Sequence, residues 1–399
     1  MSLSTLPLSY CTNVHPGTSV AEVTAGLRNV TAHVGRQFGH PLAAGLWLAQ
    51  PAINELASQP TIDQLQQSLE EAGVVCYTLN AFPYGNFHGD RVKEQVYLPD
   101  WTSADRLDYT WGCAQVLAAI MPEGTEGSLS TVPLGFKGLP HDSNFMPRCA
   151  EQLVQLAGQL DALHDETGRV VRLAIEPEPL CVLETTAETL TFFESVWRAA
   201  QRAGLTEAAR RHLGICYDVC HQSVEFEDVA ESIKSIRSAG VRLNKIHLTC
   251  AIRLEWPADN VEGRKALAHF AEPRYLHQTF ARSADGTILS LSDLEQSFCE
   301  SPPASFAAAD EWRVHFHVPV NAESIGPLKT TRDDLKLALQ TVAGLEYAPH
   351  LEVETYTWGV LPDSEKPSLI DGLTAELSAT RKLLDDLRDG TSSTGQRSS

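Results

Sequence analysis

The sequence predicts an α/β fold, a (β/α)8 TIM barrel in which eight parallel strands alternate with helices. Short β-rich runs alternate with longer helical segments, which is the pattern of parallel strands joined by right-handed crossovers. The length of 399 residues is ordinary for one such barrel with insertions. From residue 171 onward, four apolar runs end in a side chain that can bind a divalent metal. Buried acids and imidazoles are costly unless paired, so we expect a metal-centred barrel.

Nine segments are candidate strands, one more than such a barrel needs. In chain order they are 8–12, 44–49, 74–79, 130–136, 171–176, 213–218, 243–248, 313–320 and 350–355. Helical segments lie between them. One is expected over 61–72, where Thr61 and Gln64 form a capping-box pattern and Gly73 offers a stop. Another is expected over about 331–343.

The regular spacing breaks between the seventh strand and the last one. From 250 to about 312 the sequence is irregular, with the turn signals PADN, ADG and SPPAS. We interpret this segment as an insertion within a single domain over 1–388, and the run RVHFHVPV at 313–320 as part of it. The tail 389–399 is small and polar, so we expect it to be disordered.

Composition favours a globular protein that acts on small molecules. Hydrophobic residues make up 43% of the chain, which is ample for a large core. With 51 acidic and 31 basic residues the formal charge is −20, so we expect neither nucleic acid nor an anionic membrane as a partner. The chain shows neither a signal peptide nor an apolar run of about 18 residues, so we expect no membrane span and a cytoplasmic location. Its nine cysteines are scattered without a CxxC pair, which argues against a disulfide framework.

The four metal-binding candidates stand where strands end and βα loops begin, the position of catalytic groups in such barrels. Glu176 is the first polar group after VRLAI, Asp218 ends LGICYD, and His247 lies in the apolar run LNKIHL. The last run, LEVETYTW, offers Glu352 and Glu354, which point the same way because the side-chain period of a strand is two. We take Glu354 as the ligand because it lies nearer the barrel mouth, although Glu352 remains an alternative.

Further side chains lie beside these candidates. Glu178 is either a second carboxylate of the site or a solvated loop acid. His221 follows Asp218 by three residues, so it is a metal ligand, a substrate contact or a loop histidine bonded to backbone. Cys216 and Cys220 flank the site and are better explained as small hydrophobic residues than as zinc thiolates.

Over roughly residues 8–360, the chain resembles the xylose isomerase-like TIM barrel superfamily. The resemblance rests on the order of four features along the chain: a strand-end Glu, then Asp-x-x-His, then a His within a strand, and a final Glu. Members of the superfamily include sugar isomerases and epimerases with one Mn, Co, Mg or Zn ion, and endonuclease IV with a zinc cluster. The resemblance implies Glu176, Asp218, His247 and Glu354 as metal ligands and places His221 at the family's histidine after the aspartate. It also implies Glu176 and Glu354 as catalytic acid and base. The phrases CTNVHPG, IEPEP, YDVCHQ, KIHLT, HFHVP and LEVETYTWGVLP are similar to the bacterial EboE group, cytoplasmic proteins encoded in a metabolite-traffic gene cluster.

The insertion adds residues that this pattern does not contain, namely His277, Arg282, His315 and His317. In the HFH run, His315 and His317 point to one face of a strand, so with His277 they could complete a second metal site. The alternative is a polar edge strand. Endonuclease IV also uses extra histidines, but the acidity of this chain argues against a DNA substrate.

Several loops could contact a substrate. After the third strand, the run NAFPYGNFHG combines aromatic residues with Gly and Pro, which suits an aromatic wall over a sugar or is ordinary loop packing. The candidates for substrate binding are His15, Phe82, His88, His221 and Trp358.

Three functions are compatible with these observations. The first is a metal-dependent isomerase or epimerase of a sugar, cyclitol or sugar phosphate, which abstracts a proton beside a carbonyl while Mn, Co, Zn or Mg polarises the oxygens. The second is a non-catalytic metabolite-binding or traffic protein on the same fold. The third is a metal-dependent phosphoester hydrolase of the endonuclease IV type.

Overall fold

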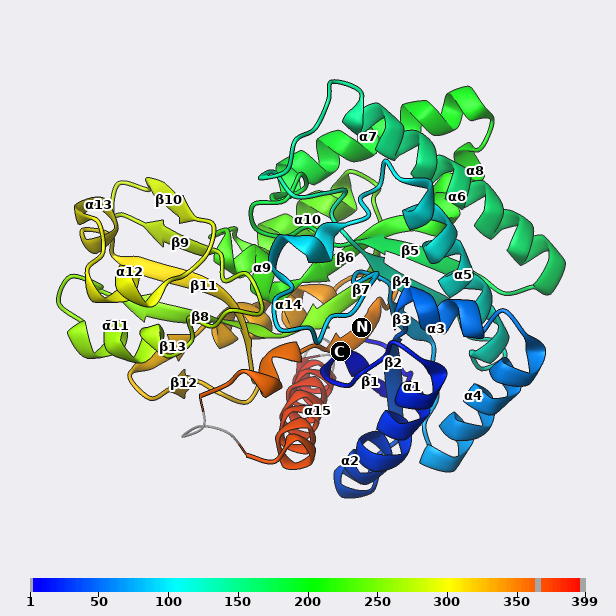
Figure 1. The fold of residues 1–399 in the computed structure, drawn as a ribbon, viewed down its shortest axis with the longest axis horizontal. Coiled ribbons are helices and arrows are strands. Elements are labelled where there is room, and N and C mark those ends of the chain that lie inside the picture. The colour runs from blue at the N-terminus through cyan, green and yellow to red at the C-terminus, as the bar shows by residue number, and fades with distance from the viewer. Residues whose placement is uncertain (1–2, 363–366, 395–399) are drawn as a thin grey trace.

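The computed structural model describes residues 3–362 and 367–394 and contains a closed barrel of eight parallel strands (Figure 1). Around the barrel the strands follow the order β1-β14-β7-β6-β5-β4-β3-β2. The barrel strands are β1 (Leu8–Cys11), β2 (Leu42–Trp47), β3 (Thr78–Asn80), β4 (Gly127–Thr131), β5 (Val171–Ile175), β6 (Leu213–Asp218), β7 (Leu243–Leu248) and β14 (His350–Val353). The predicted (β/α)8 fold is therefore confirmed.

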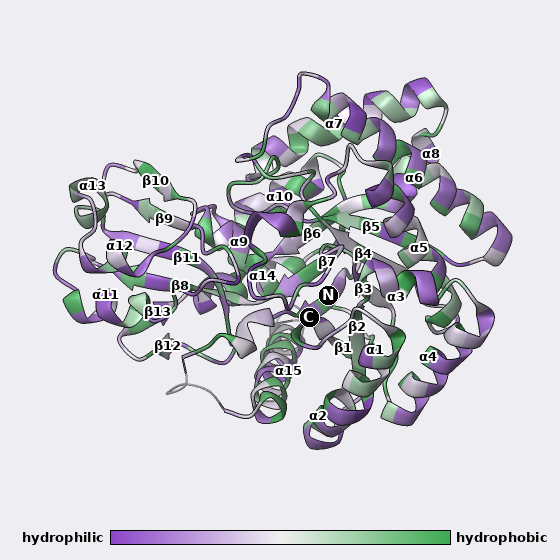
Figure 2. Ribbon diagram, viewed as in Figure 1, coloured by the Kyte–Doolittle hydropathy of each residue, from purple (hydrophilic) through white to green (hydrophobic). Residues whose placement is uncertain are grey.

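Helices surround this barrel, as Figure 1 shows, and in Figure 2 they carry hydrophilic and hydrophobic residues in alternating bands. They are α1 (Val20–Gly26), α2 (Ala32–Phe38), α3 (Gln50–Glu55), α4 (Gln59–Ala72), α5 (Ala104–Ile120), α6 (Phe145–Thr167), α7 (Thr186–Ala203), α8 (Thr206–His212), α9 (Val219–Val224), α10 (Val229–Ser238), α14 (Arg332–Val342) and α15 (Leu369–Thr394). The ends of α7 illustrate the local signals. Thr185 and Glu188 form a capping box at its start, and Gly204 ends it at a φ of 71°.

Some element boundaries differ from the expectation. Helix α4 begins at Gln59, and the Thr61 hydroxyl bonds the carbonyls of Glu55 and Ser58 instead of capping the helix. Gly73 does end this helix, at a φ of 69°. The third strand covers 78–80 where 74–79 was expected, and the fourth covers 127–131 where 130–136 was expected.

The segment Cys250–Thr330 forms a second, antiparallel sheet beside the barrel, at the left of Figure 1, with the strand order β10-β9-β11-β8-β13-β12. Its strands are β8 (Cys250–Glu255), β9 (Thr279–Arg282), β10 (Ile288–Leu291), β11 (Glu311–Val318), β12 (Ser324–Ile325) and β13 (Leu328–Thr330). Its short helices are α11 (Val261–Ala268), α12 (Gln296–Glu300) and α13 (Ala304–Ala307). The ninth strand candidate is β11, so it pairs within this sheet and not in the barrel. The inserted structure thus continues beyond residue 312 to β13.

The C-terminal helix α15 packs against α2 and fixes two loops through one buried acid. Glu376 accepts hydrogen bonds from the Val320 amide at 3.0 Å, the Thr355 hydroxyl at 2.7 Å and the Trp358 indole at 2.9 Å. The helix continues through 389–394, the first part of the tail for which we expected disorder. The rest of that tail, 395–399, lies outside the described residues.

All nine cysteines are free and buried, and none is more than 1% exposed. Burial raises the pKa of each of their thiols. Among the described residues, no helix is both long and apolar enough to cross a membrane.

Candidate metal centre

Four strand ends bring the predicted ligands together at one end of the barrel. Glu176 follows β5, Asp218 ends β6, His247 lies in β7 and Glu354 follows β14. The parallel register sets Asp218 beside His247, so both reach the same height in the barrel. One ligand atom from each of the four buried residues lies within 4.8 Å of the others. The structure thus gathers the four residues that the sequence selected, in a geometry that could hold a divalent metal.

The imidazole of His247 is the centre of this group. Its Nδ1 atom lies 2.8 Å from Glu176 Oε1, 2.8 Å from Glu354 Oε2 and 3.6 Å from Asp218 Oδ2. Its Nε2 atom faces away from the group and lies 3.2 Å from Glu352 Oε2. An Nε2–H donated to Glu352 leaves the Nδ1 lone pair free for a metal, which is the usual arrangement of a histidine ligand and a supporting carboxylate.

The two candidate acids of the last strand therefore have different positions. Glu352 lies behind His247, where it pairs with the Lys245 ammonium group and accepts a hydrogen bond of 3.0 Å from the Ser9 hydroxyl. Gly45 leaves room for it, since a Cβ there would lie 1.3 Å from Glu352 Oε1. Although burial acts to raise it, Lys245 and His247 lower the pKa of Glu352 to about 2. Glu352 supports the imidazole from outside the ligand group.

Glu354 faces into the ligand group. Its Oε1 atom accepts hydrogen bonds from Asn13 Nδ2 at 2.9 Å and Asn80 Nδ2 at 2.8 Å, which leaves Oε2 directed at His247. Sequence reasoning missed both asparagines, although Asn80 ends β3 in the same way that Asp218 ends β6. A search for any polar strand-end residue, and not only for ionisable ones, would have found it.

The charges of the group suit a cation. Burial raises the pKa of the Glu176 carboxyl to about 7, with Glu354 and Asp218 adding to the rise and His247 opposing it. Burial also acts to raise the pKa values of Asp218 and Glu354, but the neighbouring histidines outweigh it and lower both. Glu176 Oε2 and Asp218 Oδ2 are buried and have no hydrogen-bond partner among the described residues. Such unsatisfied carboxylate oxygens fit a bound divalent ion.

A cavity of ≈520 Å³, counted out to its mouth, lies over this group. Its polar floor includes Glu176, Glu178, His221, His315, His317 and Glu354. Its walls are largely aromatic and include Phe82, Phe87, Tyr97, Tyr275 and Tyr356. This mixture of apolar walls with a few polar groups is typical of a small-molecule site.

Two of the predicted substrate contacts, Phe82 and His221, line the cavity, and three do not. His15 is buried, with its Nε2 atom 3.1 Å from the Tyr10 hydroxyl. His88 Nε2 bonds the His15 carbonyl at 2.9 Å. The Trp358 indole donates to Glu376 on α15. These three side chains follow strand ends as expected, but each is held by a neighbouring loop or helix and none of them lines the cavity.

Glu178 is a buried cavity residue and not a solvated loop acid. Its Oε1 atom accepts a hydrogen bond of 2.6 Å from the Tyr97 hydroxyl, and burial raises the pKa of this carboxyl to about 8. Tyr97, from the long loop after β3, was missed because nothing in its sequence context marks it.

The inserted sheet contributes to the cavity through β11. His315 and His317 extend from this strand toward the barrel mouth, whereas His277 does not join them. The His277 ring lies between the His315 carbonyl at 3.1 Å and Glu272 Oε1 at 2.9 Å. Of the expected trio, the structure thus brings His315 and His317 together at the cavity and places His277 apart from them. Arg282 lies over the Phe226 ring at 4.4 Å and does not line the cavity.

No protein-family model matches the chain, and no curated protein matches its sequence. Among solved structures, the chain is similar to an L-ribulose 3-epimerase, with 11% identity, 99% of each chain covered and a TM-score of 0.52. It is also similar to a xylose isomerase-like TIM barrel protein from Mycobacterium smegmatis in complex with magnesium, with 11% identity, 97% of this chain and 99% of that chain covered, and a TM-score of 0.52. The chain thus has the fold of the xylose isomerase-like TIM barrels.

Proposed function

We propose that this protein is a metal-dependent isomerase or epimerase of a sugar or cyclitol. One observation carries the proposal. Glu176 and Glu354 both lie 2.8 Å from the same His247 nitrogen and both line the cavity, so a substrate bound there meets two carboxyl groups. Epimerisation beside a carbonyl needs such a pair, because a proton leaves one face of the carbon and returns to the other.

Glu176, Asp218, His247 and Glu354 would hold the metal, with Mn, Co, Zn and Mg as the candidates. When bound, the metal would polarise the carbonyl and hydroxyl oxygens of the substrate. The magnesium complex of the M. smegmatis protein with this fold supports the assignment.

The two carboxyl groups differ in the way that acid–base exchange requires. With a pKa of about 7, raised chiefly by burial, Glu176 can both take up and release a proton near neutral pH. The pKa of Glu354 is lowered despite its burial, because His247 and His317 favour its charged form. At rest Glu176 is therefore the group more readily protonated and Glu354 the charged one, so Glu354 can take a proton from one face of the carbon while Glu176 returns one to the other. For the opposite epimer the two carboxyl groups exchange these roles.

The cavity favours an uncharged substrate over a phosphorylated one. Lys93 is the one lysine or arginine among the described lining residues. Its ammonium group is already bonded to Asp293 Oδ2 at 2.6 Å and to the Tyr275 carbonyl at 2.6 Å. A phosphate group would therefore lack a free cation, whereas the aromatic walls suit the C–H faces of a sugar ring or cyclitol. The resemblance to the EboE group supports a role in metabolite processing or traffic.

Hydrogen exchange tests this function directly. The protein would be incubated in D2O with Mn and L-ribulose, or with a ketocyclitol, and examined by NMR for deuterium at the carbon beside the carbonyl. We expect exchange in the wild type and a loss of at least about 100-fold in Glu176→Gln. Glu225→Gln is the matched control, because Glu225 is a buried acid away from the cavity whose pKa burial raises to about 10.

The outcomes separate the proposed function from its alternative. Metal bound by the wild type and lost in Asp218→Asn and His247→Ala, measured by plasma mass spectrometry, together with deuterium exchange supports the isomerase or epimerase. The same metal with no exchange for any ketose or ketocyclitol contradicts it and leaves a metabolite-binding protein on this fold.

A further inference from the structure

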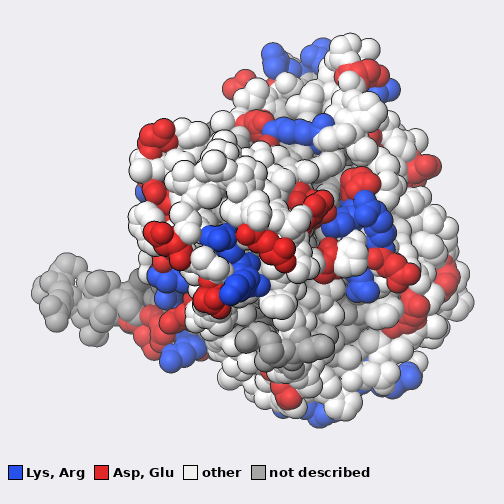
Figure 3. All heavy atoms as spheres, turned by 60° about the vertical axis from the view of Figure 1, so that its left-hand side comes forward, with Lys and Arg blue, Asp and Glu red and all other residues white. Residues whose placement is uncertain are grey.

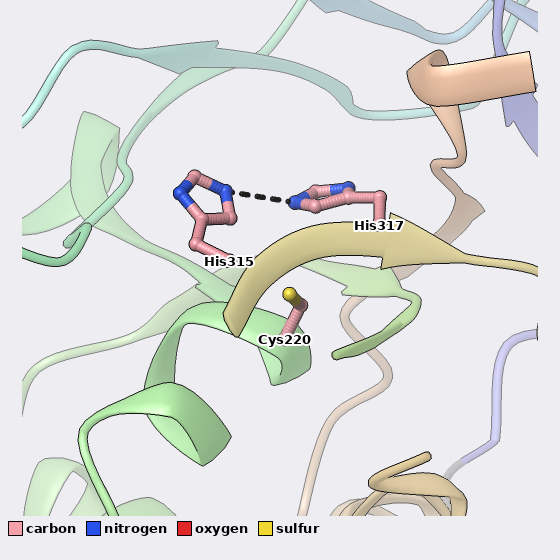
Figure 4. A group of neighbouring side chains, drawn as sticks. All are labelled: Cys220, His315 and His317. Atoms are coloured by element: carbon pink, nitrogen blue, oxygen red, sulfur yellow. Dashed lines mark hydrogen bonds between the residues drawn. The ribbon is translucent and has the colours of Figure 1, made fainter. Parts of the chain in front are cut away.

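Three imidazole rings meet in the cavity beside the first ligand group, the four residues that could hold the metal. His315 and His317 extend from β11, and their Nε2 atoms are 3.2 Å apart (Figure 4). The Nε2 atoms of His317 and His221 are 3.3 Å apart. All three side chains are buried, and none of them is a metal ligand or an acid–base group in the proposed function.

In two of these rings the other nitrogen donates to a backbone carbonyl. His221 Nδ1 lies 2.9 Å from the Pro177 carbonyl oxygen, and His317 Nδ1 lies 2.8 Å from that of Glu354. Because a carbonyl oxygen can only accept, the hydrogen of each neutral imidazole is on Nδ1. The Nε2 atoms of both rings are therefore acceptors.

The third ring is oriented by the side-chain amide of Gln278. Gln278 Nε2 donates to the Pro179 carbonyl at 3.2 Å and to the Tyr97 hydroxyl at 3.1 Å. The oxygen of the amide is therefore the atom that faces His315, and His315 Nδ1 donates to it at 2.7 Å. Burial lowers the pKa values of His315 and His317, which keeps both rings neutral with an acceptor at Nε2.

The three Nε2 atoms cannot satisfy one another, because all of them are acceptors. Among the described residues, the contacts of His315 Nε2 and His317 Nε2 are with other imidazole nitrogens and not with a donor. A buried acceptor without a donor is costly, so the donors must come from a molecule in the cavity that both rings line. The 3.2 Å between the two acceptors on β11 decides which molecule fits.

Two hydroxyl groups on neighbouring carbon atoms match this separation. When they are gauche, their oxygens are about as far apart as the oxygens of an O–H···O hydrogen bond, roughly 2.8 Å, so each hydroxyl can donate to one ring. A single ammonium group does not match. Its N–H bonds diverge by about 109°, so acceptors at about 2.8 Å from the nitrogen lie about 4.6 Å from each other.

We infer that His315 and His317 bind a vicinal diol of the substrate, so that the inserted sheet selects a polyol over its deoxy analogues. This inference rests on the proposed function for the position of the diol. The metal would engage the carbonyl and the hydroxyl beside it, so the diol is the next pair of hydroxyls along the carbon chain. In a ketopentose such as L-ribulose these are the hydroxyls at C4 and C5.

Binding of deoxy analogues tests this selection. The metal-loaded, full-length protein would be titrated in a calorimeter with L-ribulose, 4-deoxy-L-ribulose and 5-deoxy-L-ribulose. Each analogue leaves one Nε2 acceptor without a donor, so we expect the wild type to bind it at least about 10-fold more weakly than L-ribulose. A second series, myo-inositol and its monodeoxy analogues, covers the cyclitols.

Substitution of one ring at a time assigns the selection to this pair. His315→Phe and His317→Phe keep a ring and remove the acceptor, so each should lose discrimination against one ribulose analogue and retain it against the other. A merely structural role would weaken the binding of all three ligands equally. Cys220→Ala and His277→Gln are the matched controls and should discriminate as the wild type does. Cys220, drawn beside the pair in Figure 4, packs in an apolar cluster, and His277 is bonded to Glu272.

The wild type alone can overturn the inference, even if neither Phe variant folds. Equal binding within each series, or no binding of either parent compound, would do so. A metal equivalent lost from both variants, measured by plasma mass spectrometry, would also overturn it, because the pair would then belong to a metal. Discrimination without deuterium exchange would support the inference and contradict the proposed function, whereas exchange without discrimination would do the reverse.

Discussion

Glu352 holds the His247 ring in place, and the first ligand group depends on the orientation of that ring. Lys245 and His247 lower the pKa of Glu352 to about 2 against the effect of burial, so this acid is ionised near neutral pH. A permanent negative charge at Nε2 fixes the orientation of the ring and makes Nδ1 a stronger ligand. The metal affinity therefore depends on a residue that would not itself touch the metal.

Substitution of Gly45 tests this support. A Cβ at Gly45 would lie 1.3 Å from Glu352 Oε1, so Gly45→Ala must displace the carboxylate and with it the His247 ring. We expect the affinity for Mn at the first site to fall about 10–100-fold, as for the loss of other supporting carboxylates, measured by isothermal titration of the apo protein.

The control is Gly35→Ala, where the nearest atom to a new Cβ is Leu42 Cδ2 at 3.8 Å. Gly35 lies within α2, so this change should leave metal affinity unaltered and raise the free energy of unfolding by about 1 kcal/mol. Equal metal affinity in both variants would show that the position of Glu352 has no effect on the site.

Part of the ligand group could be predicted from the sequence, residue by residue. Glu176, Asp218, His247 and Glu354 were identifiable because each interrupts or ends an apolar strand. The period of a strand does not separate Glu352 from Glu354, since both side chains point the same way, and only the position of Lys245 and the asparagines distinguishes them.

The histidines of the insertion show a second limit of predicting the site from the sequence. Their spacing placed His315 and His317 on one face of a strand, but the partner that completes the group, His221, comes from a different part of the chain. Pairing across an insertion depends on how two sheets meet, and that information is not in a local pattern.

Among the elements, strands β6 and β7 span 213–218 and 243–248 as expected, whereas β3 and β4 are displaced. In β4 the apolar run continues past the strand into a buried loop, where Leu134 adopts a φ of 69°. Hydrophobicity predicts burial and not hydrogen bonding, so it overestimates the length of a strand that leads into a buried loop.

Helix α15 should introduce a pH dependence of stability through Glu376. Burial raises the pKa of this carboxyl from 4.5 to about 7, a change equivalent to roughly 3 kcal/mol. Because the folded pKa is the higher one, this stability is fully present below about pH 4.5 and is lost as the pH rises through 7.

Chemical denaturation of the wild type and Glu376→Gln between pH 4.5 and 8 measures this effect. The difference in unfolding free energy should change by roughly 3 kcal/mol over that interval, in the direction that favours the variant at high pH. Asp386→Asn, an exposed acid on the same helix, is the control and should follow the wild type. Parallel curves for all three proteins would contradict the prediction.

For the whole molecule, metal removal should lower thermal stability. The buried carboxylates of the ligand group are left without a counter-ion, and a metal at about 100 times its dissociation constant contributes about 2.7 kcal/mol. For a chain of this length that corresponds to a fall in Tm of about 3 °C on chelation, measured by scanning calorimetry. The Asp218→Asn variant should respond less to the chelator, and a wild type that loses its metal at constant Tm would argue against a native-state site.

On the face shown in Figure 3, Lys and Arg side chains lie among Asp and Glu side chains, so neither sign of charge is gathered in one patch. The side chains best suited to bind a cation lie inside the molecule instead, at the barrel mouth.

The reactivity of the nine buried thiols can be used to measure unfolding. Alkylating agents need an accessible thiolate, so the folded protein should resist iodoacetamide and acquire mass only when it opens. Cys250 lies in β8 and Cys299 in α12, both within the inserted segment, and the other seven lie in the barrel and the helices and loops around it, so the adduct pattern distinguishes two kinds of opening. Molecules with either no adduct or nine would mean that sheet and barrel open as one cooperative unit. An early species with two adducts would mean that the sheet can detach by itself, exposing His315 and His317 while the barrel ligands stay in place.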